Sequence, residues 1–483
     1  MTVPLPVDVA IIGGGPAGSA AGSLLASWGH AVCVLHDTGD RSRGLAESIP
    51  PSTHKLLATI GALDAVERAA FYRGRGNTVW WASSRRRDER FDAPYGFQVF
   101  RPDFDRVLLE TAAAAGARIE GARVRAVTFD HEAVRVIFEG GDGQRQHITS
   151  RIVLDCSGRA GVLARRFRRQ ESGQRTLGLV GVWRANESVE RDLPDPSHTI
   201  VETFGEGWAW SVPTSAATRH VGAMVGEGAF VGDGSHGLER RYRQLMAKAP
   251  RLSRVLEGAA LQRVFACDAS PYASDTYASR QCLFVGDAGS FIDPLSSFGV
   301  KKALASAWLA AVAAHTSLAH PDRASIARDF FSDWERRVYR THLRRSREFA
   351  REAAAAHDGP FWAARADVDV DAVDDVDDGV TVRSVFERFK AAPSIDLRIA
   401  DAGRVEPRPV VRGNEIVLEP ALAGGLRFAA NVDLVRLAEI APHYRQVPDL
   451  FEAYCRTNPP VPLPNIVGGL SLLVAKGILY ETR

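Results

Sequence analysis

The sequence of 483 residues predicts an α/β fold with an interleaved antiparallel sheet, followed by a small α+β domain. Residues 7–37 read as strand, glycine turn, helix and strand, and a second strand–glycine–helix unit begins at Cys282. Strand-like segments at about 76–100 and 176–264 lie between these units. The chain exceeds what one hydrophobic core organises, so we expect several domains.

The first unit contains a GxGxxG turn. In "VDVAIIGGGPAGSAAGSLLASWGHAVCVLHD" the first glycine permits a tight turn, the second lets backbone approach a pyrophosphate, and the third lets helix pack on strand. This pattern predicts a Rossmann-like nucleotide-binding domain. His36 takes the place of the usual acidic residue after the second strand, with Asp37 beside it, and either side chain could bond a ribose hydroxyl. The candidate cofactor-binding residues of the turn are Gly13, Gly15, Pro16, Ala17 and Gly18.

The second unit is "CLFVGDAGSFIDPLSSFGVKKALASAWLAAVAAH", which starts at Cys282. A buried strand runs into a Gly-Asp pair, then into a loop, then into a long helix. Asp287 at the strand end can accept a hydrogen bond from a ribityl hydroxyl, and the helix N-terminus favours negative charge. The candidate cofactor-binding residues of this unit are Gly286, Asp287, Pro294, Phe298, Gly299 and Val300.

This layout resembles the FAD-dependent aromatic monooxygenases and the related flavin-dependent halogenases, over roughly residues 5–350. Segments 46–64, 99–112 and 152–167 resemble their flavin-contact elements, and "GWAWSVP" (207–213) matches a WxWxxP signature of the halogenase branch. The resemblance implies FAD as cofactor. It assigns Arg43, Ser48 and Arg101 to the flavin site, and Glu47, Trp208 and Trp210 to catalysis. Because the two tryptophans alternate on a strand, ordinary core packing also explains them.

The stretch "RGRGNTVWWA" (73–82) departs from the halogenase pattern. In halogenases a lysine between flavin and substrate directs hypohalous acid, and the resemblance places Gly74 at that position. Arg73 and Arg75 flank it, but a guanidinium stays protonated and does not form the same adduct. Phe298 stands where small residues usually frame the halide. Halogen chemistry is therefore disfavoured.

The remaining chemistry is direct oxygen transfer, so the resemblance implies a monooxygenase that hydroxylates an electron-rich aromatic ring through a flavin C4a-hydroperoxide. A tryptophan side chain of a peptide or protein, modified during cofactor maturation, is one such substrate. Trp80 and Trp81 would suit it if they line the cavity. The alternatives are a flavin-dependent halogenase and a non-catalytic flavin-bound scaffold that binds peptides. O2 is the co-substrate, and NAD(P)H or a separate flavin reductase supplies electrons.

The predicted organisation is a flavin module over 1–360, an acidic linker or loop over 361–380, and a small winged-helix-like domain over 381–483. Residues 405–422 read as a hairpin, and Pro464 and Gly477 bound the last helix. Two interpretations of the C-terminal domain stay open. It docks a peptide or protein, or it caps the flavin module.

Composition bears on the partners, the metal and disulfide content and the localisation to be expected. With 60 basic and 58 acidic residues the net charge is +2, so nucleic acid and membrane are not expected as partners. The five cysteines lack paired spacing, which argues against disulfides and a metal site. The absence of a signal-like segment or a long apolar run indicates a cytoplasmic protein.

Overall fold

A computed structural model describes residues 6–39, 44–171, 173–185, 195–226, 234–296, 298–367, 382–391 and 394–482. The chain forms two compact units, Met1–Val370 and Asp371–Arg483. The first unit has the predicted α/β fold with parallel and antiparallel sheets, and the second is the predicted small α+β unit.

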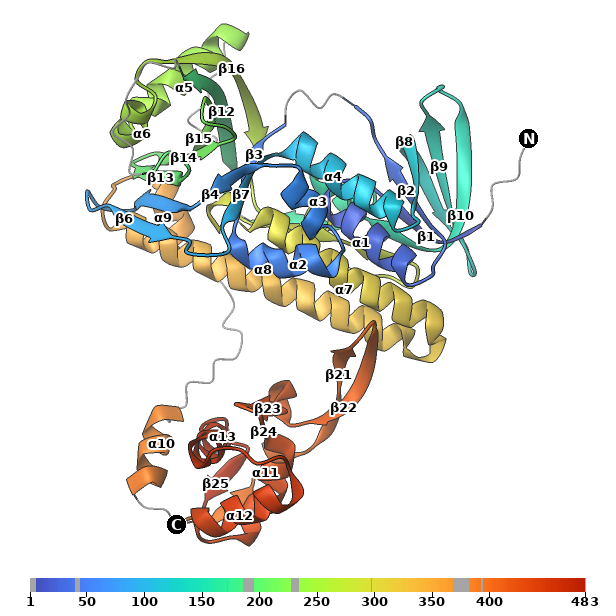
Figure 1. Ribbon diagram of the computed structural model, residues 1–483, viewed down its shortest axis with the longest axis vertical. Helices are drawn as coiled ribbons and strands as arrows, with labels where there is room; N and C mark the ends of the chain where they lie inside the picture. Colours follow the sequence, from blue (N-terminus) through green and yellow to red (C-terminus); the bar gives the residue numbers. More distant parts are fainter. Residues whose placement is uncertain are drawn as a thin grey trace. The chain divides into compact units, whose positions relative to one another are not determined.

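A mixed sheet of the first unit, parallel except for the two pairings of the strand Val134–Gly140, surrounds the strand that precedes the glycine turn (Figure 1). β1 (Val7–Ile12) pairs in parallel with β2 (Val32–His36) on one side and β10 (Arg145–Asp155) on the other. The apolar runs of β1 and β2 are almost fully buried, as expected where helices cover the sheet. α1 (Pro16–Ser27) packs on β2 and α4. The other elements of this layer are α4 (Arg101–Ala114), β8 (Arg118–Phe129), β9 (Val134–Gly140) and β18 (Cys282–Phe284).

The interleaved sheet is antiparallel except where β13 and β5 pair in parallel. Its strands lie at the strand-like segments expected at about 76–100 and 176–264, except that Gly96–Phe100 belongs to a smaller sheet. Alternating side chains of these strands give one face to the interior. The smaller sheet has three strands in the order β3 (Ala46–Ile49), β7 (Gly96–Phe100) and β4 (Tyr72–Gly74). In spatial order, the strands of the larger sheet are β16 (Ala259–Asp268), β12 (Thr176–Ala185), β15 (Thr218–Gly226), β14 (Gly207–Pro213), β13 (Thr199–Phe204), β5 (Gly76–Trp80) and β6 (Arg87–Arg90).

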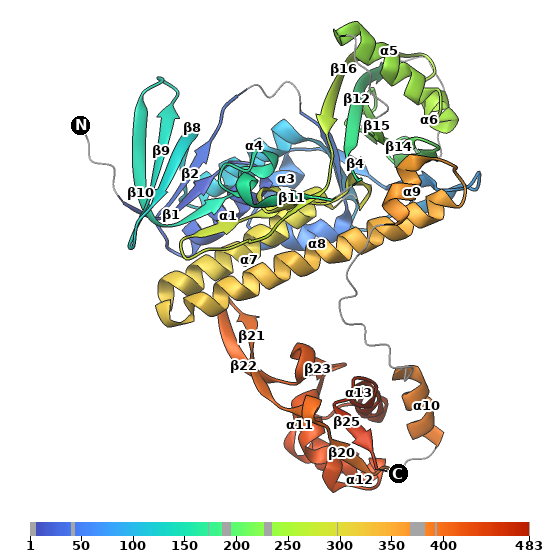
Figure 2. The same cartoon turned by 180° about the vertical axis from the view of Figure 1, so that it is seen from behind.

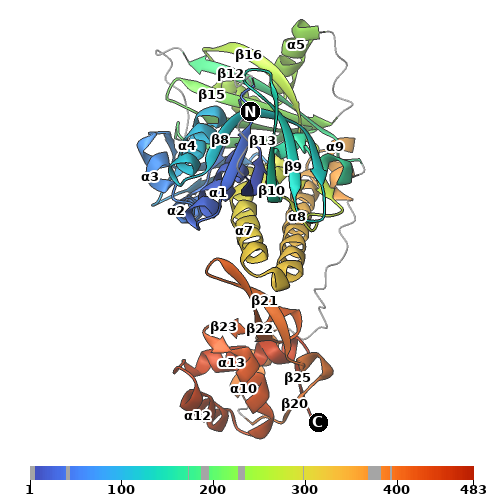
Figure 3. The same ribbon diagram turned by 90° about the vertical axis from the view of Figure 1, so that its right-hand side faces the viewer.

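Two long helices complete the first unit. α7 (Gly299–Ala319) and α8 (Ala324–Ala354) run side by side (Figure 2), and Figure 3 shows the short turn that joins them. α7 contacts α1 and α2 (His54–Thr59) as well as α8. Its many alanines are buried on most sides, since small side chains let several helices approach one another closely.

The second unit has its own core. The predicted hairpin is present as β21 (Glu406–Arg412) and β22 (Glu415–Ala421), and Gly477 follows the last helix with φ +66°. Buried residues of the unit form one cluster that includes Val385, Leu434 and Leu470. The remaining elements are α10 (Val382–Ala391), β20 (Leu397–Ile399), β23 (Phe428–Ala429), β24 (Val432–Asp433), α11 (Leu434–Ile440), α12 (Val447–Thr457), α13 (Leu463–Ala475) and β25 (Leu479–Glu481).

The segment between the units differs in part from the predicted linker. Residues Pro360–Ala366 form α9, and Trp362 is buried there with an exposed fraction of 1%. Its indole Nε1 donates to the Phe204 carbonyl at 2.8 Å. Residues 368–381, which hold the acidic stretch, lie outside the described part of the chain.

Candidate active site

The glycine turn has the backbone geometry that its sequence predicts. Gly13 has φ +106°, and a Cβ there would lie 2.5 Å from the Cys156 carbonyl oxygen. Gly15 is the N-cap of α1, and a Cβ at this position would meet only Asp105 Oδ2, at 3.8 Å. A Cβ on Gly18 would overlap the Gly13 carbonyl, so Gly18 serves helix packing rather than ligand contact. Gly13 therefore permits the turn and the close approach of the Cys156 backbone, Gly15 leaves space for a ligand, and Gly18 lets the helix pack on the strand.

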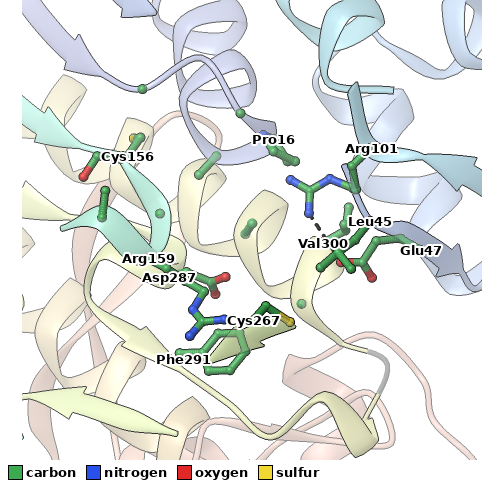
Figure 4. Close-up of a pocket in the computed structure, with 18 of the residues that line it drawn as sticks. Pro16, Leu45, Glu47, Arg101, Cys156, Arg159, Cys267, Asp287, Phe291 and Val300 are labelled. Atoms are coloured by element: carbon green, nitrogen blue, oxygen red, sulfur yellow. Dashed lines mark hydrogen bonds and ion pairs between the residues drawn. The ribbon is translucent and has the colours of Figure 1, made fainter. Parts of the chain in front are cut away.

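A cavity of about 770 Å³ opens in front of this turn (Figure 4). It is bordered by the N-termini of α1 and α7, by β3 and by the interior face of the larger sheet. Most of the predicted site residues line it. They are Gly13, Gly15, Pro16, Ala17, His36, Asp37, Glu47, Ser48, Arg101, Trp208, Trp210, Asp287, Pro294, Gly299 and Val300.

Three predicted site residues lie elsewhere. Besides Gly18, Gly286 is outside the cavity wall; its φ is +62°, and its N–H donates to Ser306 Oγ at 2.8 Å. Phe298 packs its ring against His342 of α8, with centroids 4.7 Å apart, and is not among the residues of the cavity wall. Arg43 lies outside the described residues.

Arg101 and Glu47 form an ion pair at the cavity wall. Arg101 Nη1 lies 3.3 Å from Glu47 Oε1 (Figure 4), and Arg101 Nε lies 2.9 Å from Asp105 Oδ1. Burial raises the pKa of Glu47, which Arg101 partly opposes. Burial also disfavours the charge of Arg101, but Asp105 and Glu47 outweigh it, so the pKa of Arg101 is raised. The charged guanidinium of Arg101 thus faces the cavity, and its two carboxylate partners fix its orientation.

Asp287 projects from the loop that follows β18. Its Oδ1 is buried and has no hydrogen-bond partner within the described structure, while Lys302 Nζ lies 3.7 Å away. The loop is held by Arg168, which donates to the carbonyls of Gly158, Asp287 and Ala288. Arg168 therefore ties together the two loops that border the cavity, a role that the sequence did not reveal because its partners are backbone oxygens.

The interior face of the larger sheet forms an apolar lobe of the same cavity. Trp208, Trp210 and Val212 alternate along β14, so they project from one face, and Met224 pairs opposite Trp208 on β15. Trp210 packs flat over Gly222, where an added Cβ would collide with the indole. The lobe is completed by Thr199, Val201, Cys267, Ala269 and Phe291. This lobe suits a flat, apolar ligand.

The other two tryptophans that the sequence singled out do not line the cavity. Trp81 is 4% exposed and packs edge to face on Trp362 at 5.5 Å, so it belongs to the core. Trp80 packs against the core of the larger sheet. Sequence analysis also missed Arg159, which lines the cavity with its guanidinium 4.6 Å from the Phe291 ring centroid. Strand alternation could have identified Thr199 and Val201, whereas Arg159 has no pattern that marks it.

The residues present fit an FAD molecule. α1 and α7 both begin at the cavity wall without a side-chain cap hydrogen bond, so their first N–H groups remain available to negative charge. Asp287 offers a carboxylate oxygen without a hydrogen-bond partner to a sugar-like hydroxyl. The long cavity joins this polar end to the apolar lobe, which matches the chemistry of a dinucleotide beside an aromatic substrate.

These features define a flavoprotein with FAD as its cofactor. The chain belongs to the FAD binding domain family, whose family model matches residues 6–312. It is an FAD-dependent enzyme of the oxidoreductase type, within the superfamily of flavin-dependent halogenases and monooxygenases.

Individual relatives agree with this assignment. The chain is 30% identical to a tryptophan 2-halogenase of Chondromyces crocatus over 358 residues, covering 71% of this chain and 67% of the relative. A flavin-dependent halogenase of Metacordyceps chlamydosporia is 28% identical, covering 66% of each chain. The chain thus spans about two thirds of the length of these relatives.

Two solved structures share the fold over nearly the whole chain. The flavin-dependent halogenase CmlS has a TM-score of 0.81 at 20% identity, covering 100% of this chain and 97% of CmlS. The peptidyl tryptophan dihydroxylase QhpG has a TM-score of 0.71 at 22% identity, covering 98% and 100%. Both matches extend through the C-terminal unit.

The described residues contain no cluster of three or more metal-ligating side chains. None of the described helices has the length and hydropathy needed to cross a membrane. All five cysteines are free thiols.

We expect Asp287→Ala to weaken FAD binding by about 10- to 100-fold, since a hydrogen bond to a charged group contributes roughly 1.5–3 kcal/mol. Fluorescence titration of apoprotein with FAD measures this loss. Asp275→Ala is the control, because Asp275 pairs with Arg169 through a half-exposed carboxylate outside the cavity wall. Equal affinity of the Asp287 variant and wild type would remove this carboxylate from the flavin site.

Proposed function

We propose that this protein is an FAD-dependent monooxygenase that hydroxylates an electron-rich aromatic ring carried by a peptide or protein, with a tryptophan side chain as the substrate group. One observation carries the proposal. The cavity joins the dinucleotide end to an apolar lobe with two tryptophans, and none of the described residues that line it is a lysine. O2 is the co-substrate, and NAD(P)H or a separate reductase is the source of electrons.

Reduced FAD, when bound, supplies the electrons that activate O2. The chain's own part is binding, orientation and exclusion of water. Trp208 and Trp210 offer ring faces on which an aromatic substrate stacks, and Val201 and Met224 keep that lobe apolar. An electron-rich ring needs no strong base before it attacks oxygen. Glu47, whose pKa burial raises, is the carboxyl group positioned to accept or return a proton at the cavity wall.

The surroundings of Gly74 support hydroxylation over halogenation. Gly74 lies on β4, and a Cβ there would be 2.7 Å from Gln98 Nε2. Gln98 is 2% exposed, and its Nε2 donates to Thr199 Oγ1 at 3.1 Å and to the Ser197 carbonyl at 3.2 Å. The space that a lysine side chain would enter is therefore filled by a hydrogen-bonded glutamine.

We expect turnover to be independent of halide. In halide-free buffer with a reductase, product should form at the full rate and be heavier by whole oxygen atoms, because none of the described cavity-lining residues is a lysine that could direct a halogen species. Mass spectrometry of products made with and without bromide measures this. A brominated product would instead establish the second candidate, a flavin-dependent halogenase, which the 30% identity to a tryptophan 2-halogenase favours.

The third candidate is a flavin-bound scaffold that binds peptides without turnover. Oxygen consumption separates it from both enzymes: a scaffold consumes no O2 in proportion to bound peptide. The proposal of a peptide or protein substrate rests on the second unit, which has its own core. The solved peptidyl tryptophan dihydroxylase matches this unit, and so does the halogenase CmlS, so the truncation experiment decides what the unit does.

A further inference from the structure

A buried lysine stands directly behind the cavity wall. Lys302 of α7 is 3% exposed, and its helical neighbours Gly299, Val300 and Ala303 all line the cavity. Lys302 Nζ donates to the Ser290 carbonyl and lies 3.7 Å from Asp287 Oδ1. A buried ammonium group is costly unless it is paired, so its retention at this position calls for a partner.

The partners of Lys302 form a small buried network. Glu335 of α8 is 1% exposed, its Oε2 has no hydrogen-bond partner in the described structure, and Ser306 bonds to its other oxygen. Burial raises the pKa of Glu335, opposed by Lys302. Asp287 is thus the carboxylate that is both next to Lys302 and in the cavity wall. The titratable and charged groups that face Asp287 or Lys302 are Glu47, Arg101, Arg168, Tyr272, Glu335 and His342.

We propose that Lys302 is a positioning residue for the flavin site, which holds the Asp287 carboxylate in place at the cavity wall so that it accepts a hydrogen bond from the cofactor. The adjacent Lys301 lies outside this buried network. Lys301 Nζ bonds to Ser52 Oγ at 2.9 Å in an exposed contact and lies over the Phe298 ring. The two consecutive lysines therefore form a matched pair, one inside and one outside the network.

The test compares Lys302→Met with Lys301→Met, since methionine has a similar length but no charge. FAD affinity of the apoproteins is measured by titration at one neutral pH. Without the ammonium group 3.7 Å from it, the Asp287 carboxylate loses the charged neighbour that holds it at the cavity wall, so its hydrogen bond to the cofactor weakens. We expect a loss of FAD affinity of about 10-fold for the Lys302 variant, since a hydrogen bond to a charged group contributes at least that much. Lys301→Met should follow wild type.

Three further variants keep the result interpretable. Lys302→Met with Glu335→Gln removes one positive and one negative buried group together, so it carries the test if the single variant does not fold. Lys302→Arg keeps the cation and should restore the wild-type FAD affinity. On an Asp287→Asn background, Lys302→Met should change FAD affinity less than twofold, since its effect passes through the carboxylate.

The inference is overturned by any of three results: a loss of FAD affinity that Lys302→Arg does not restore, a Lys302 variant indistinguishable from Lys301→Met, or full additivity with Asp287→Asn. It rests on this cavity being the FAD site and on nothing about the reaction. If the hydroxylase proposal failed, the FAD affinities of these variants would not change. If this inference failed, the product formed by the wild-type protein would not change.

Discussion

Gly15→Val is expected to yield folded, colourless protein. The backbone at Gly15 has φ −80° and ψ −169°, which a valine adopts without strain, and an added Cβ would meet only Asp105 Oδ2 at 3.8 Å. The valine methyls would instead extend into the cavity in front of the α1 N-terminus, where we propose that the cofactor's pyrophosphate binds. We expect FAD affinity to fall by at least about 100-fold, equivalent to ~2.8 kcal/mol. Flavin absorbance after purification and titration of the apoprotein measure it.

Two other glycines provide the controls. Gly141→Val is the neutral control, because Gly141 is exposed, has open space around its added Cβ and lies outside the cavity wall. Gly18→Val is the structural contrast, since its Cβ would overlap the Gly13 carbonyl and separate helix from strand. A yellow Gly15 variant with an unchanged flavin spectrum would contradict the assignment of the turn to FAD.

The features that could be predicted from sequence are those whose chemistry is local. The glycine turn, Asp287 at a strand end and the alternating tryptophans of β14 each follow from residues a few positions apart, and all of them reach the cavity. The antiparallel sheet was likewise predictable, because alternating segments between two nucleotide-contact units have few other arrangements.

Residues whose position depends on distant packing could not be predicted in this way. Phe298 was expected in the flavin loop, but its ring lies on His342, which is far away in sequence on α8. Arg168 donates hydrogen bonds to backbone carbonyls of two other loops, and no residue pattern in the sequence predicts such contacts. The sequence does not distinguish Lys302 from the adjacent Lys301. In the structure Lys302 is buried, whereas Lys301 bonds to Ser52 in an exposed contact.

Removal of the C-terminal unit is expected to leave a yellow protein that no longer processes a large substrate. A chain that ends at Val380 loses everything from Thr381 onward, yet every described residue that lines the cavity lies between Ile12 and Ala303. The core of the removed unit, from Val385 to Leu479, is made of its own residues. We therefore expect FAD content within about twofold of the full-length protein, a difference of less than ~0.5 kcal/mol.

Turnover of a peptide or protein substrate should fall by about 100-fold or more in the truncated chain. Binding energy from parts of a substrate far from the reacting ring is used to orient that ring, so its loss lowers kcat as well as raising KM. A free indole or phenol, which makes no remote contacts, should be turned over at the same slow rate by both proteins. This small-substrate rate is the internal control for an intact flavin site.

The opposing interpretation, that the C-terminal unit caps the flavin module, makes the contrary prediction. In that case the truncated protein should be insoluble or colourless, and free indole turnover should disappear together with peptide turnover. A soluble, yellow truncated protein that remains as active as the full chain on its peptide substrate would end the docking proposal. Comparing flavin content with the two turnover rates separates docking from capping, because docking affects only the large substrate and capping affects both.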